Sequence, residues 1–400
     1  MDLGDGKKHE HFRAELRDFI QQYRERAPEG QGVMGGRASE AMLAWQKLLL
    51  DRGYAARAIP REYGGCGREA DLLETIILGE EFARAGVSAG VSGPGVDMLV
   101  PTLLEHGSEE QKRRFVPPTI RGEIAWCQGY SEPGAGSDLA SLRTSAHLEG
   151  DDFVVDGQKV WTSSAHMADM MFALVKSEPE KKRHAGISYL LIPMNSPGVE
   201  VRPLRSMTDE QEFNQVFLNA VRVPKANLVG QRGQGWEIAN TTLVHERLVA
   251  GNPRELEATL QSLVALMKRE RRNGQRGIDR AVFRDRLMRL QARVLGLKSH
   301  AMRLSTCEMK RESPGIAGLV VKLQACELMY RMATLAVDAL GEVGVLQPGS
   351  KHAGSEASWQ TAQMRWLGFI IAGGSAQIQK NIIAERGLGL PREPKPQAPS

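Results

Sequence analysis

Residues 151–163 read DDFVVDGQKVWTS, two short runs in which apolar and polar residues alternate. Alternation with a period of two is typical of a β-strand with one buried face. The Asp-Gly dipeptide at 156–157 separates the runs, and Asp-Gly between alternating runs is typical of a two-residue hairpin turn. The stretch therefore predicts a β-hairpin at 156–157 within a region of β-structure.

The strand pattern extends on both sides of this stretch, from about residue 122 to about residue 224. Apolar runs alternate with turn residues in MMFALVKS (170–177), GISYLLIPM (186–194), VEVRPL (199–204) and NQVFLNAVRV (214–223). Several short strands in a region of this size are typical of a small β-barrel or sandwich.

Helical periodicity flanks the β-region on both sides. Phe12, Leu16 and Phe19 recur at spacings of four and three, as on one face of a helix. Ser108 precedes two glutamates and is typical of a helix N-cap. After about residue 233 the helical spacing returns and continues to about residue 388.

We therefore expect an α+β protein. The predicted parts are an N-terminal helical domain at 1–122, a middle β-barrel or sandwich at 123–232, a C-terminal four-helix bundle at 233–388 and a disordered, Pro-rich tail at 389–400.

Composition excludes several classes of protein. The chain is 42% hydrophobic and 25% charged, with a net charge of +4 over 400 residues. This charge gives no reason to expect nucleic-acid binding, and the one basic run, KRERRNGQR (268–276), is interpreted as a solvated helix end or a contact to a cofactor phosphate. No long apolar run or signal-peptide core occurs, so we expect a cytoplasmic protein without a membrane span.

The four cysteines are far apart, with no Cys-x-x-Cys pair and no histidine at metal-ligand spacing. This pattern favours buried free thiols in a reducing compartment, and it predicts no metal site.

Four stretches, in order along the chain, carry a resemblance to a known family. They are CQGYSEPGAGSDLASL (127–142), VDGQKVWTSSAHMADMMFALVK (155–176), FNQVFLNAVRVPKANLVGQRGQGW (213–236) and GGSAQIQKNIIAERGLGLPRE (373–393). They resemble the (T/S)EP-x-x-GSD, NG-x-K-x-W-(I/T)-(T/S), F-x-x-V-x-VP-x-x-N-x-(L/V)-G and GGT-x-E-I-Q segments of the acyl-CoA dehydrogenases. The resemblance covers essentially the whole chain.

This resemblance implies a helical–β–helical fold and a flavoenzyme. Family members bind FAD, oxidise acyl-CoA thioesters to trans-2-enoyl-CoA and pass the electrons to electron-transfer flavoprotein. Their FAD sites are completed across subunits, which implies a homotetramer or an α2β2 heterotetramer. We therefore expect FAD, an acyl-CoA substrate and electron-transfer flavoprotein as ligands and partners.

The first of the four stretches matches the flavin-contact segment of the family, from Gln128 to Ser137. The match implies that Tyr130 and Ser131 lie at the pyrimidine edge of the flavin, that Gly136 belongs to the same cradle and that Ser137 also lies near the CoA moiety of the substrate. Short residues and glycines let backbone N–H groups approach the flavin edge, where negative charge grows during reduction.

The second stretch matches the family segment that lies along the far face of the flavin. The match assigns Trp161, Thr162 and Ser163 to the cofactor, with a hydroxyl near N5. A tryptophan in a strand is more commonly a core residue, but the neighbouring motif favours a cofactor wall.

A helix in the C-terminal half keeps a spacing that family members use on a neighbouring subunit's FAD. Arg280 and Phe283 have the R-x-x-F spacing and Gln291 follows, but Arg284 replaces the usual glycine. Arg280 could equally belong to a solvated helix face. A second segment of this kind, usually a Gly-Gly run, reads ALGEVGVL (339–346) here, so that contact stays open.

The family reaction needs a carboxylate to remove the proton next to the thioester. Many members carry that glutamate in the C-terminal turn, where this chain has Gly373. Some members, chiefly long-chain, branched-chain and several bacterial steroid-side-chain enzymes, carry it on the first long helix of the C-terminal domain, before an arginine. Here LVHERLVAG (243–251) places Glu246 and Arg247 at those positions.

We therefore predict that Glu246 is the catalytic base and that Arg247 lies near the substrate. Residues one helical turn from Glu246 carry no cation, so burial is expected to raise its pKa. Gly373 is predicted to offer its backbone N–H to the thioester carbonyl. The match assigns the rest of its turn, Gly374, Ser375 and Gln377, to FAD.

Other readings stay open. The same fold carries flavin-dependent monooxygenases and oxidases, and some chains are one subunit of a heterotetramer. A DNA-binding relative is a further alternative, and Glu246–Arg247 could be an ordinary exposed pair. The residues do not define the length, branching or ring content of the acyl group.

Overall fold

The structure is a computed structural model that describes residues 6–28, 36–250, 253–310, 312, 316–352 and 358–392. The chain divides into two compact units, Met1–Glu246 and Arg247–Ser400, which are described in turn. Most of the expected tail at 389–400 lies outside the described residues, from residue 393 onward.

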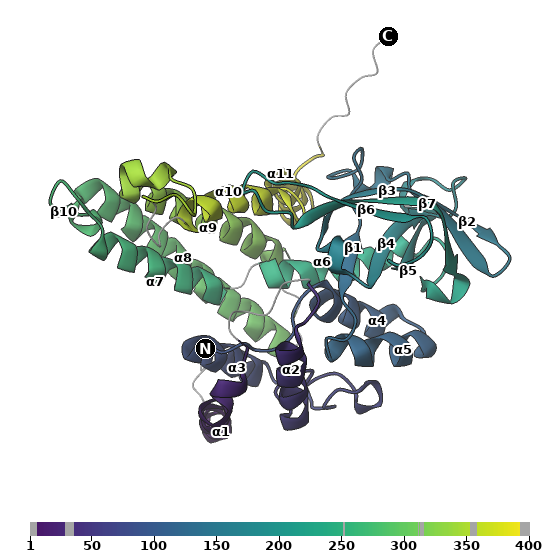
Figure 1. Ribbon diagram of the computed structural model, residues 1–400, viewed down its shortest axis with the longest axis horizontal. Coiled ribbons are helices and arrows are strands. Elements are labelled where there is room, and N and C mark those ends of the chain that lie inside the picture. Colours follow the sequence, from purple (N-terminus) through teal and green to yellow (C-terminus); the bar gives the residue numbers. More distant parts are fainter. Residues whose placement is uncertain are drawn as a thin grey trace, which may run out of the picture. The chain divides into compact units, whose positions relative to one another are not determined.

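The first unit begins with helices and continues into a β-sheet (Figure 1). The helices are α1 (Lys7–Tyr23), α2 (Glu40–Arg52), α3 (Leu72–Ala85), α4 (Val100–His106) and α5 (Glu109–Ile120). The strands are β1 (Trp126–Gly129), β2 (Ser145–Glu149), β3 (Asp152–Ser163), β4 (Met170–Lys176), β5 (Ile187–Pro193), β6 (Val199–Pro203), β7 (Phe213–Pro224) and β8 (Leu228–Val229). Helix α6 (Gly235–Ala250) follows the last strand.

The strands lie in the order β6-β7-β3-β2-β4-β5-β8, with β1 pairing in parallel with β4. Successive side chains of a strand point to opposite faces, so alternate residues of β4 and β5 enter two different clusters. Phe172 and Tyr189 pack with residues of α4 and α5. Met171 and Leu190 pack with residues of β3 and β7, so the sheet curves over itself. The predicted strands and the expected architecture are confirmed.

The predicted hairpin at 156–157 is wrong. Strand β3 runs through both residues, and the hairpin joins β2 to β3, with Glu149 paired to Asp152. Gly157 is required for another reason, because a Cβ there would lie 2.7 Å from the Cα of Thr144. The glycine marks a close backbone approach within a strand, which composition alone does not distinguish from a turn.

Two irregularities change the pairing of β3 with β7. The register shifts once between Val155 and Gly157, where the extra residue is on β7, and again between Lys159 and Thr162, where it is on β3. The non-glycine residues with positive φ at these places are Ala220 (φ 48°) and Trp161 (φ 60°). Both are β-bulges, which are known to redirect side chains next to functional sites.

The N-terminal helices have their own core and a buried carboxylate between them. Trp45 and Leu49 pack against apolar residues of α1 and α3. Glu81 on α3 is 3% exposed and accepts hydrogen bonds from Arg17 at 2.9 Å and from Arg13 at 2.7 Å, both on α1. Hydrogen bonds from Arg17, opposed by burial and aided by Arg13, lower the pKa of Glu81 to about 2.

We expect Glu81→Gln to lower the free energy of unfolding at pH 7 by about 1.5–3 kcal/mol, since the bonds involve charged groups. The Glu81 contribution is complete above the ordinary pKa of 4.5 and is lost as the pH falls toward 2. Urea denaturation of variant and wild type should therefore converge over that range. The matched control is Glu80→Gln, whose side chain is 46% exposed, with an expected loss below about 1 kcal/mol.

Helix boundaries in the flanking regions follow the predicted signals. Ser108 caps α5 by accepting from the Gln111 backbone N–H at 3.2 Å, and the Gln111 side chain accepts from the Ser108 N–H, which completes a capping box.

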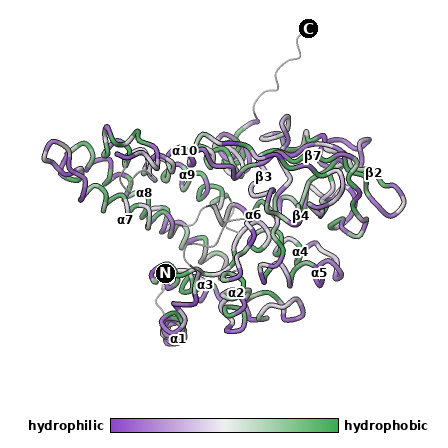
Figure 2. Tube along the Cα trace, in the orientation of Figure 1, coloured by the Kyte–Doolittle hydropathy of each residue, from purple (hydrophilic) through white to green (hydrophobic). Residues whose placement is uncertain are grey.

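The second unit is helical. It contains α7 (Pro253–Arg269), α8 (Ala281–Met309), α9 (Ala317–Leu340), α10 (Ser358–Ile371) and α11 (Ala376–Ile382), with a short hairpin of β9 (Arg271–Arg272) and β10 (Gln275–Arg276). Hydrophobic and hydrophilic residues alternate along α7 and α8 (Figure 2), and the apolar sides of α7, α8 and α9 share one core. Helices packed around a shared core confirm the expected C-terminal bundle.

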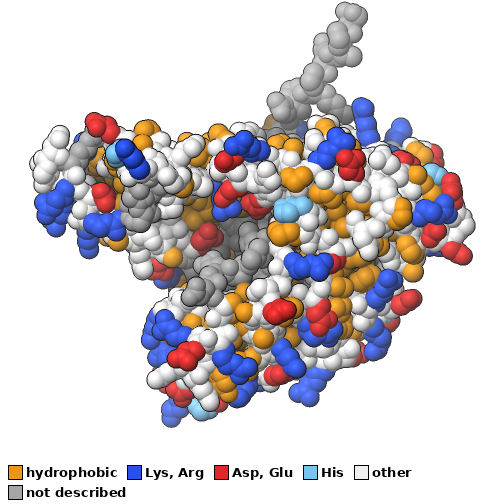
Figure 3. Space-filling model, viewed as in Figure 1, with side chains coloured by type: hydrophobic (Ala, Val, Ile, Leu, Met, Phe, Trp, Pro, Cys, Tyr) orange, Lys and Arg blue, Asp and Glu red, His pale blue; other side chains and the backbone are white. Residues whose placement is uncertain are grey.

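The basic run at 268–276 is a helix end only at its first two residues. Helix α7 ends at Arg269, and the rest forms the β9–β10 hairpin with Asn273 (φ 50°) and Gly274 (φ 79°) at its turn. Asn-Gly is a strong signal for this turn type. On the visible face of the molecule basic and acidic side chains are intermixed (Figure 3).

All four cysteines lie in the described part of the chain and none forms a disulfide. Among the described helices, none has both the length and the apolar character needed to cross a bilayer.

Candidate active site

Strand β1 and helix α6 bring two of the predicted site residues together within the first unit. The Gln128 side-chain Nε2 donates to Glu246 Oε2 at 3.3 Å, although 118 positions separate the two in sequence. Both side chains are half-buried. The structure therefore places the predicted base beside the predicted flavin-contact segment.

Hydroxyl groups anchor helix α6 one turn before Glu246. The Thr242 Oγ1 lies 3.0 Å from Thr102 Oγ1 on α4 and 3.3 Å from the Tyr189 hydroxyl on β5. Thr102, Thr242 and Tyr189 are fully buried. Burial raises the pKa of Tyr189 above its ordinary range. These neutral hydrogen bonds attach the helix to its neighbours at a fixed point.

Tyr130 lies next to this cluster. It follows β1 two residues after Gln128, is 5% exposed and packs edge-to-face against Phe172 and Tyr189. Its hydroxyl oxygen is buried and accepts or donates no hydrogen bond within the described part of the chain. Burial, with contributions from Tyr189 and the Glu246 charge, raises the pKa of Tyr130 well above its ordinary value.

A buried ion pair supports the segment that follows β1. The Lys159 Nζ, fully buried, donates to Glu132 Oε1 at 2.8 Å, to the Tyr130 carbonyl at 3.3 Å and to the Leu174 carbonyl at 2.7 Å. Burial alone would raise the pKa of Glu132, but the Lys159 charge and its hydrogen bonds hold it below its usual range. Burial lowers the pKa of Lys159, and Glu132 opposes that shift. The hydrogen bonds of Lys159 fix the Tyr130 backbone.

The second predicted cofactor segment lies against the first. The Val160 N–H donates to the Ser131 carbonyl at 2.9 Å, so the residues after β1 and the end of β3 are adjacent. Trp161 occupies the β3 bulge, and its ring is 64% exposed and meets Phe213 edge-on at 6.0 Å. A positive φ in a large residue is strained, and such strain is found at ligand sites.

The hydroxyls next to Trp161 differ in access. Thr162 is fully buried, its Oγ1 has no hydrogen-bond partner among the described residues, and Ser163 is half-exposed. Of the two, Ser163 is the one that a ligand lying on Trp161 can reach. Gly136 and Ser137 are both exposed in the loop between β1 and β2.

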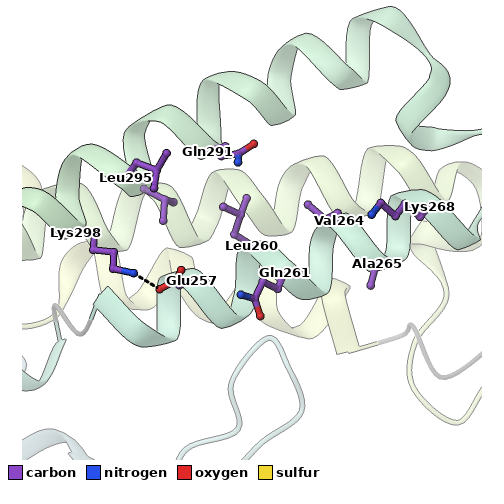
Figure 4. Close-up of a pocket in the computed structure, with 10 residues that line it drawn as sticks. Glu257, Leu260, Gln261, Val264, Ala265, Lys268, Gln291, Leu295 and Lys298 are labelled. Carbon is purple, nitrogen blue, oxygen red and sulfur yellow. Dashed lines mark hydrogen bonds and ion pairs between the residues drawn. The ribbon is translucent and has the colours of Figure 1, made fainter. Parts of the chain in front are cut away.

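The second unit carries the remaining candidates. The Arg280 guanidinium lies over the Phe283 ring, 4.3 Å from its centroid, and Phe283 is 9% exposed. Gln291 lies on α8 at the wall of a groove of about 370 Å³ between α7 and α8. Figure 4 shows the Lys298–Glu257 ion pair, 2.9 Å long, at one end of this groove and Lys268 at the other.

The glycine turn between α10 and α11 is held through its carbonyls. Gly373 (φ 61°) and Gly374 (φ 90°) adopt left-handed conformations that favour glycine. Gln379 donates to the Gly373 carbonyl at 3.1 Å, and the buried Lys322 donates to the Gly374 carbonyl at 2.9 Å.

Ser375 caps α11 by accepting from the Ile378 N–H at 3.3 Å, and Gln377 is exposed on its first turn. The Arg247 side chain lies outside the described residues, so its predicted role stays a prediction.

Three domain descriptions match the chain in succession. They are the acyl-CoA dehydrogenase N-terminal domain at residues 6–123, the middle domain at 127–221 and the C-terminal domain at 233–388. A curated acyl-CoA dehydrogenase, IpdE1 of Mycobacterium tuberculosis, is 39% identical over 396 residues, which are 96% of this chain and 99% of that protein.

The chain belongs to the acyl-CoA dehydrogenase family.

Solved acyl-CoA dehydrogenases have the same fold. The structure described as the Tcur3481-Tcur3483 steroid ACAD is 29% identical, with a TM-score of 0.80 and coverage of 98% of this chain and 100% of that one. The ChsE4-ChsE5 complex from Mycobacterium tuberculosis is 31% identical, with a TM-score of 0.79 and the same coverage. The protein is accordingly an oxidoreductase that acts on acyl-CoA.

Sequence reasoning missed two buried lysines of this acyl-CoA dehydrogenase. Lys159 holds the backbone after β1, and Lys322 holds the glycine turn. Lys322 stands in the mainly apolar run LVVKLQA, whereas Lys159 lies in a stretch of alternating polar and apolar residues. A lone lysine in an apolar run is the signal that could have identified Lys322, because a buried cation needs nearby acceptors.

Proposed function

We propose that the protein catalyses α,β-dehydrogenation of an acyl-CoA thioester to the trans-2-enoyl-CoA. Glu246 takes the α-proton onto its carboxylate, and the β-carbon loses a hydride. The observation that carries this proposal is the position of Glu246, half-buried beside the flavin-contact segment and one turn after the anchored Thr242. A base on a fixed element can be held at the distance that proton transfer needs.

The residues of the first unit fit FAD. Trp161 presents a large exposed ring on a strained bulge, and Ser163 and Ser131 carry accessible polar groups beside it. We assign Gln128, Tyr130, Ser131, Gly136, Ser137, Trp161, Thr162 and Ser163 to its cradle. When bound, FAD supplies the acceptor for the β-hydride, and electron-transfer flavoprotein then receives the electrons.

The second unit contributes by analogy with the family. Gly373 offers a backbone N–H to the thioester carbonyl, where negative charge develops as the α-proton leaves. We assign Gly374, Ser375 and Gln377, and on a neighbouring subunit Arg280, Phe283 and Gln291, to FAD.

The relatives support a proposal for the substrate class and the assembly. One solved relative is described as the ChsE4-ChsE5 complex, and another as the Tcur3481-Tcur3483 steroid ACAD. They support a steroid-derived acyl-CoA as substrate and a tetramer, either homomeric or α2β2 with a second related chain.

The proposal is tested by purifying the protein, measuring bound FAD and mixing it anaerobically with straight, branched and steroid side-chain acyl-CoAs. We expect the flavin absorbance to bleach with at least one thioester and an enoyl-CoA to form in equal amount. A flavin-loaded protein that no thioester reduces, but that consumes oxygen with a reductant, would contradict dehydrogenation and favour a monooxygenase.

A further inference from the structure

The group that contacts Glu246 from the sheet is a neutral amide. Gln128 donates from its Nε2 to Glu246 Oε2 at 3.3 Å. Its backbone is fixed, because β1 pairs in parallel with β4 and Gln128 is opposite Phe172 in that ladder. Hydrogen bonds at a catalytic group are commonly long before the substrate binds. The contact therefore joins the base to a rigid strand.

The helix backbone at the other end of the contact is also fixed. Thr242, four residues before Glu246 and thus on the same side of α6, is hydrogen-bonded toward α4 and β5. The carboxylate has its own χ angles, and the anchored helix does not restrain these. A hydrogen bond to the carboxylate itself is needed to choose one rotamer.

We propose that Gln128 is a positioning residue for the base: its amide orients the Glu246 carboxylate and keeps it ionised for α-proton abstraction. This inference rests on the proposed function of Glu246. The family match assigned Gln128 only to the flavin, so the role is additional.

An amide suits this task better than a charged or an apolar side chain. A lysine or arginine would stabilise the carboxylate so strongly that it would become a weak base. An apolar side chain would remove one hydrogen-bond donor from a half-buried charge. An amide donates to the carboxylate, and its Oε1 can accept from the carboxylic acid that forms once the α-proton has moved to Glu246.

Other titratable groups lie on the same elements. They are Tyr130 beside β1, Tyr189 on β5 and His245 on α6. Burial raises the pKa of both tyrosines and lowers that of His245. The tyrosines therefore stay neutral across the working range of pH, and His245 is the neighbour whose titration has to be separated from that of Glu246.

The test is Gln128→Met, which keeps the length of the side chain and removes the donor. Anaerobic flavin reduction by the best acyl-CoA is followed by stopped flow between pH 5.5 and 9. We expect flavin reduction to be about tenfold slower at pH 7 and the acidic limb of the pH–rate profile to move to higher pH, because a lost donor destabilises the carboxylate. The dissociation constant for the acyl-CoA should not change. Gln215→Met, the same exchange on half-buried β7, is the control and should match wild type.

A second readout does not depend on activity. Difference infrared spectroscopy follows the protonation of the Glu246 carboxyl. The Glu246 band is identified because it disappears in Glu246→Gln. The exchange His245→Gln removes the overlapping titration of the histidine. In Gln128→Met the carboxylate should form at higher pH than in wild type. Gln128→Asn keeps the amide but withdraws it by one methylene, so the titration should shift less and in the same direction. This variant replaces Gln128→Met in the test if the methionine variant does not fold.

Identical infrared titrations together with unchanged reduction rates would overturn the positioning role. If wild type binds FAD but no thioester reduces it, the proposed function fails, and the infrared titration still decides whether Gln128 controls the Glu246 proton. A shifted titration with a changed acyl-CoA dissociation constant and an unchanged reduction rate would assign Gln128 to substrate binding and would also overturn the proposal.

Discussion

Glu246→Gln should slow the reduction of bound flavin by acyl-CoA by about 10²- to 10⁴-fold, the range that general bases contribute. The exchange removes the proton acceptor and keeps the shape of the side chain and its hydrogen-bonding capacity toward Gln128. The dissociation constant of the acyl-CoA should therefore change little. Single-turnover reduction under anaerobic conditions measures the chemical step directly, with binding read from its concentration dependence.

Helix α6 offers a matched control for this experiment. Glu237 lies on the first turn of the same helix and its side chain is exposed. Glu237→Gln should reduce within about twofold of wild type, as expected of a surface exchange. If Glu246→Gln were as fast as Glu237→Gln, the base would have to be another residue, and the assignment of Glu246 would be wrong.

Lys159→Met should lower the free energy of unfolding by about 3–5 kcal/mol, the cost of leaving one member of a buried ion pair alone. The exchange leaves the Glu132 carboxylate without its cation and the Tyr130 and Leu174 carbonyls without their donor. Urea denaturation of the purified holoenzyme measures the loss. Because Lys159 holds the backbone after β1, the variant should also retain less FAD during dialysis.

Lys8→Met is the control, since Lys8 is 68% exposed and makes a 2.7 Å ion pair with Asp71. It should cost less than about 1 kcal/mol. The double variant Lys159→Met with Glu132→Gln should recover part of the loss, because it removes the unpaired charge. A Lys159→Met protein as stable as the Lys8→Met protein would show that the buried pair adds nothing to stability.

The periodicity of the sequence predicted most of the fold. Strands β4 and β5 stand out because both faces are buried and the runs are continuously apolar. A helix end was predicted where a local signal exists, as at Ser108. The Asp156–Gly157 hairpin was wrong because the same dipeptide also fits a strand that another backbone segment approaches closely.

The candidate site could be predicted only where the family resemblance reaches individual positions. It named Gln128 and Glu246 separately, but nothing in the sequence indicates that their side chains meet. The partners of Lys159 and Lys322 are also distant in sequence, since Lys159 and Glu132 are 27 positions apart and Lys322 and Gly374 are 52 positions apart. Contacts of this kind depend on how the elements pack, and no local pattern encodes them.

The two bulges in the β3–β7 ladder behave like a pair of compensating frameshifts. The extra residue on β7 near Ala220 displaces the pairing by one, and the extra residue on β3 near Trp161 restores it, so only the short interval between them is out of frame. Deleting either residue alone would leave every later pair mismatched, with inward side chains turned outward. Deleting both would restore a regular ladder without the raised tryptophan. Length changes in these two strands should therefore be inherited together. Related chains that lack both extra residues should also lack the exposed aromatic ring that Trp161 presents here.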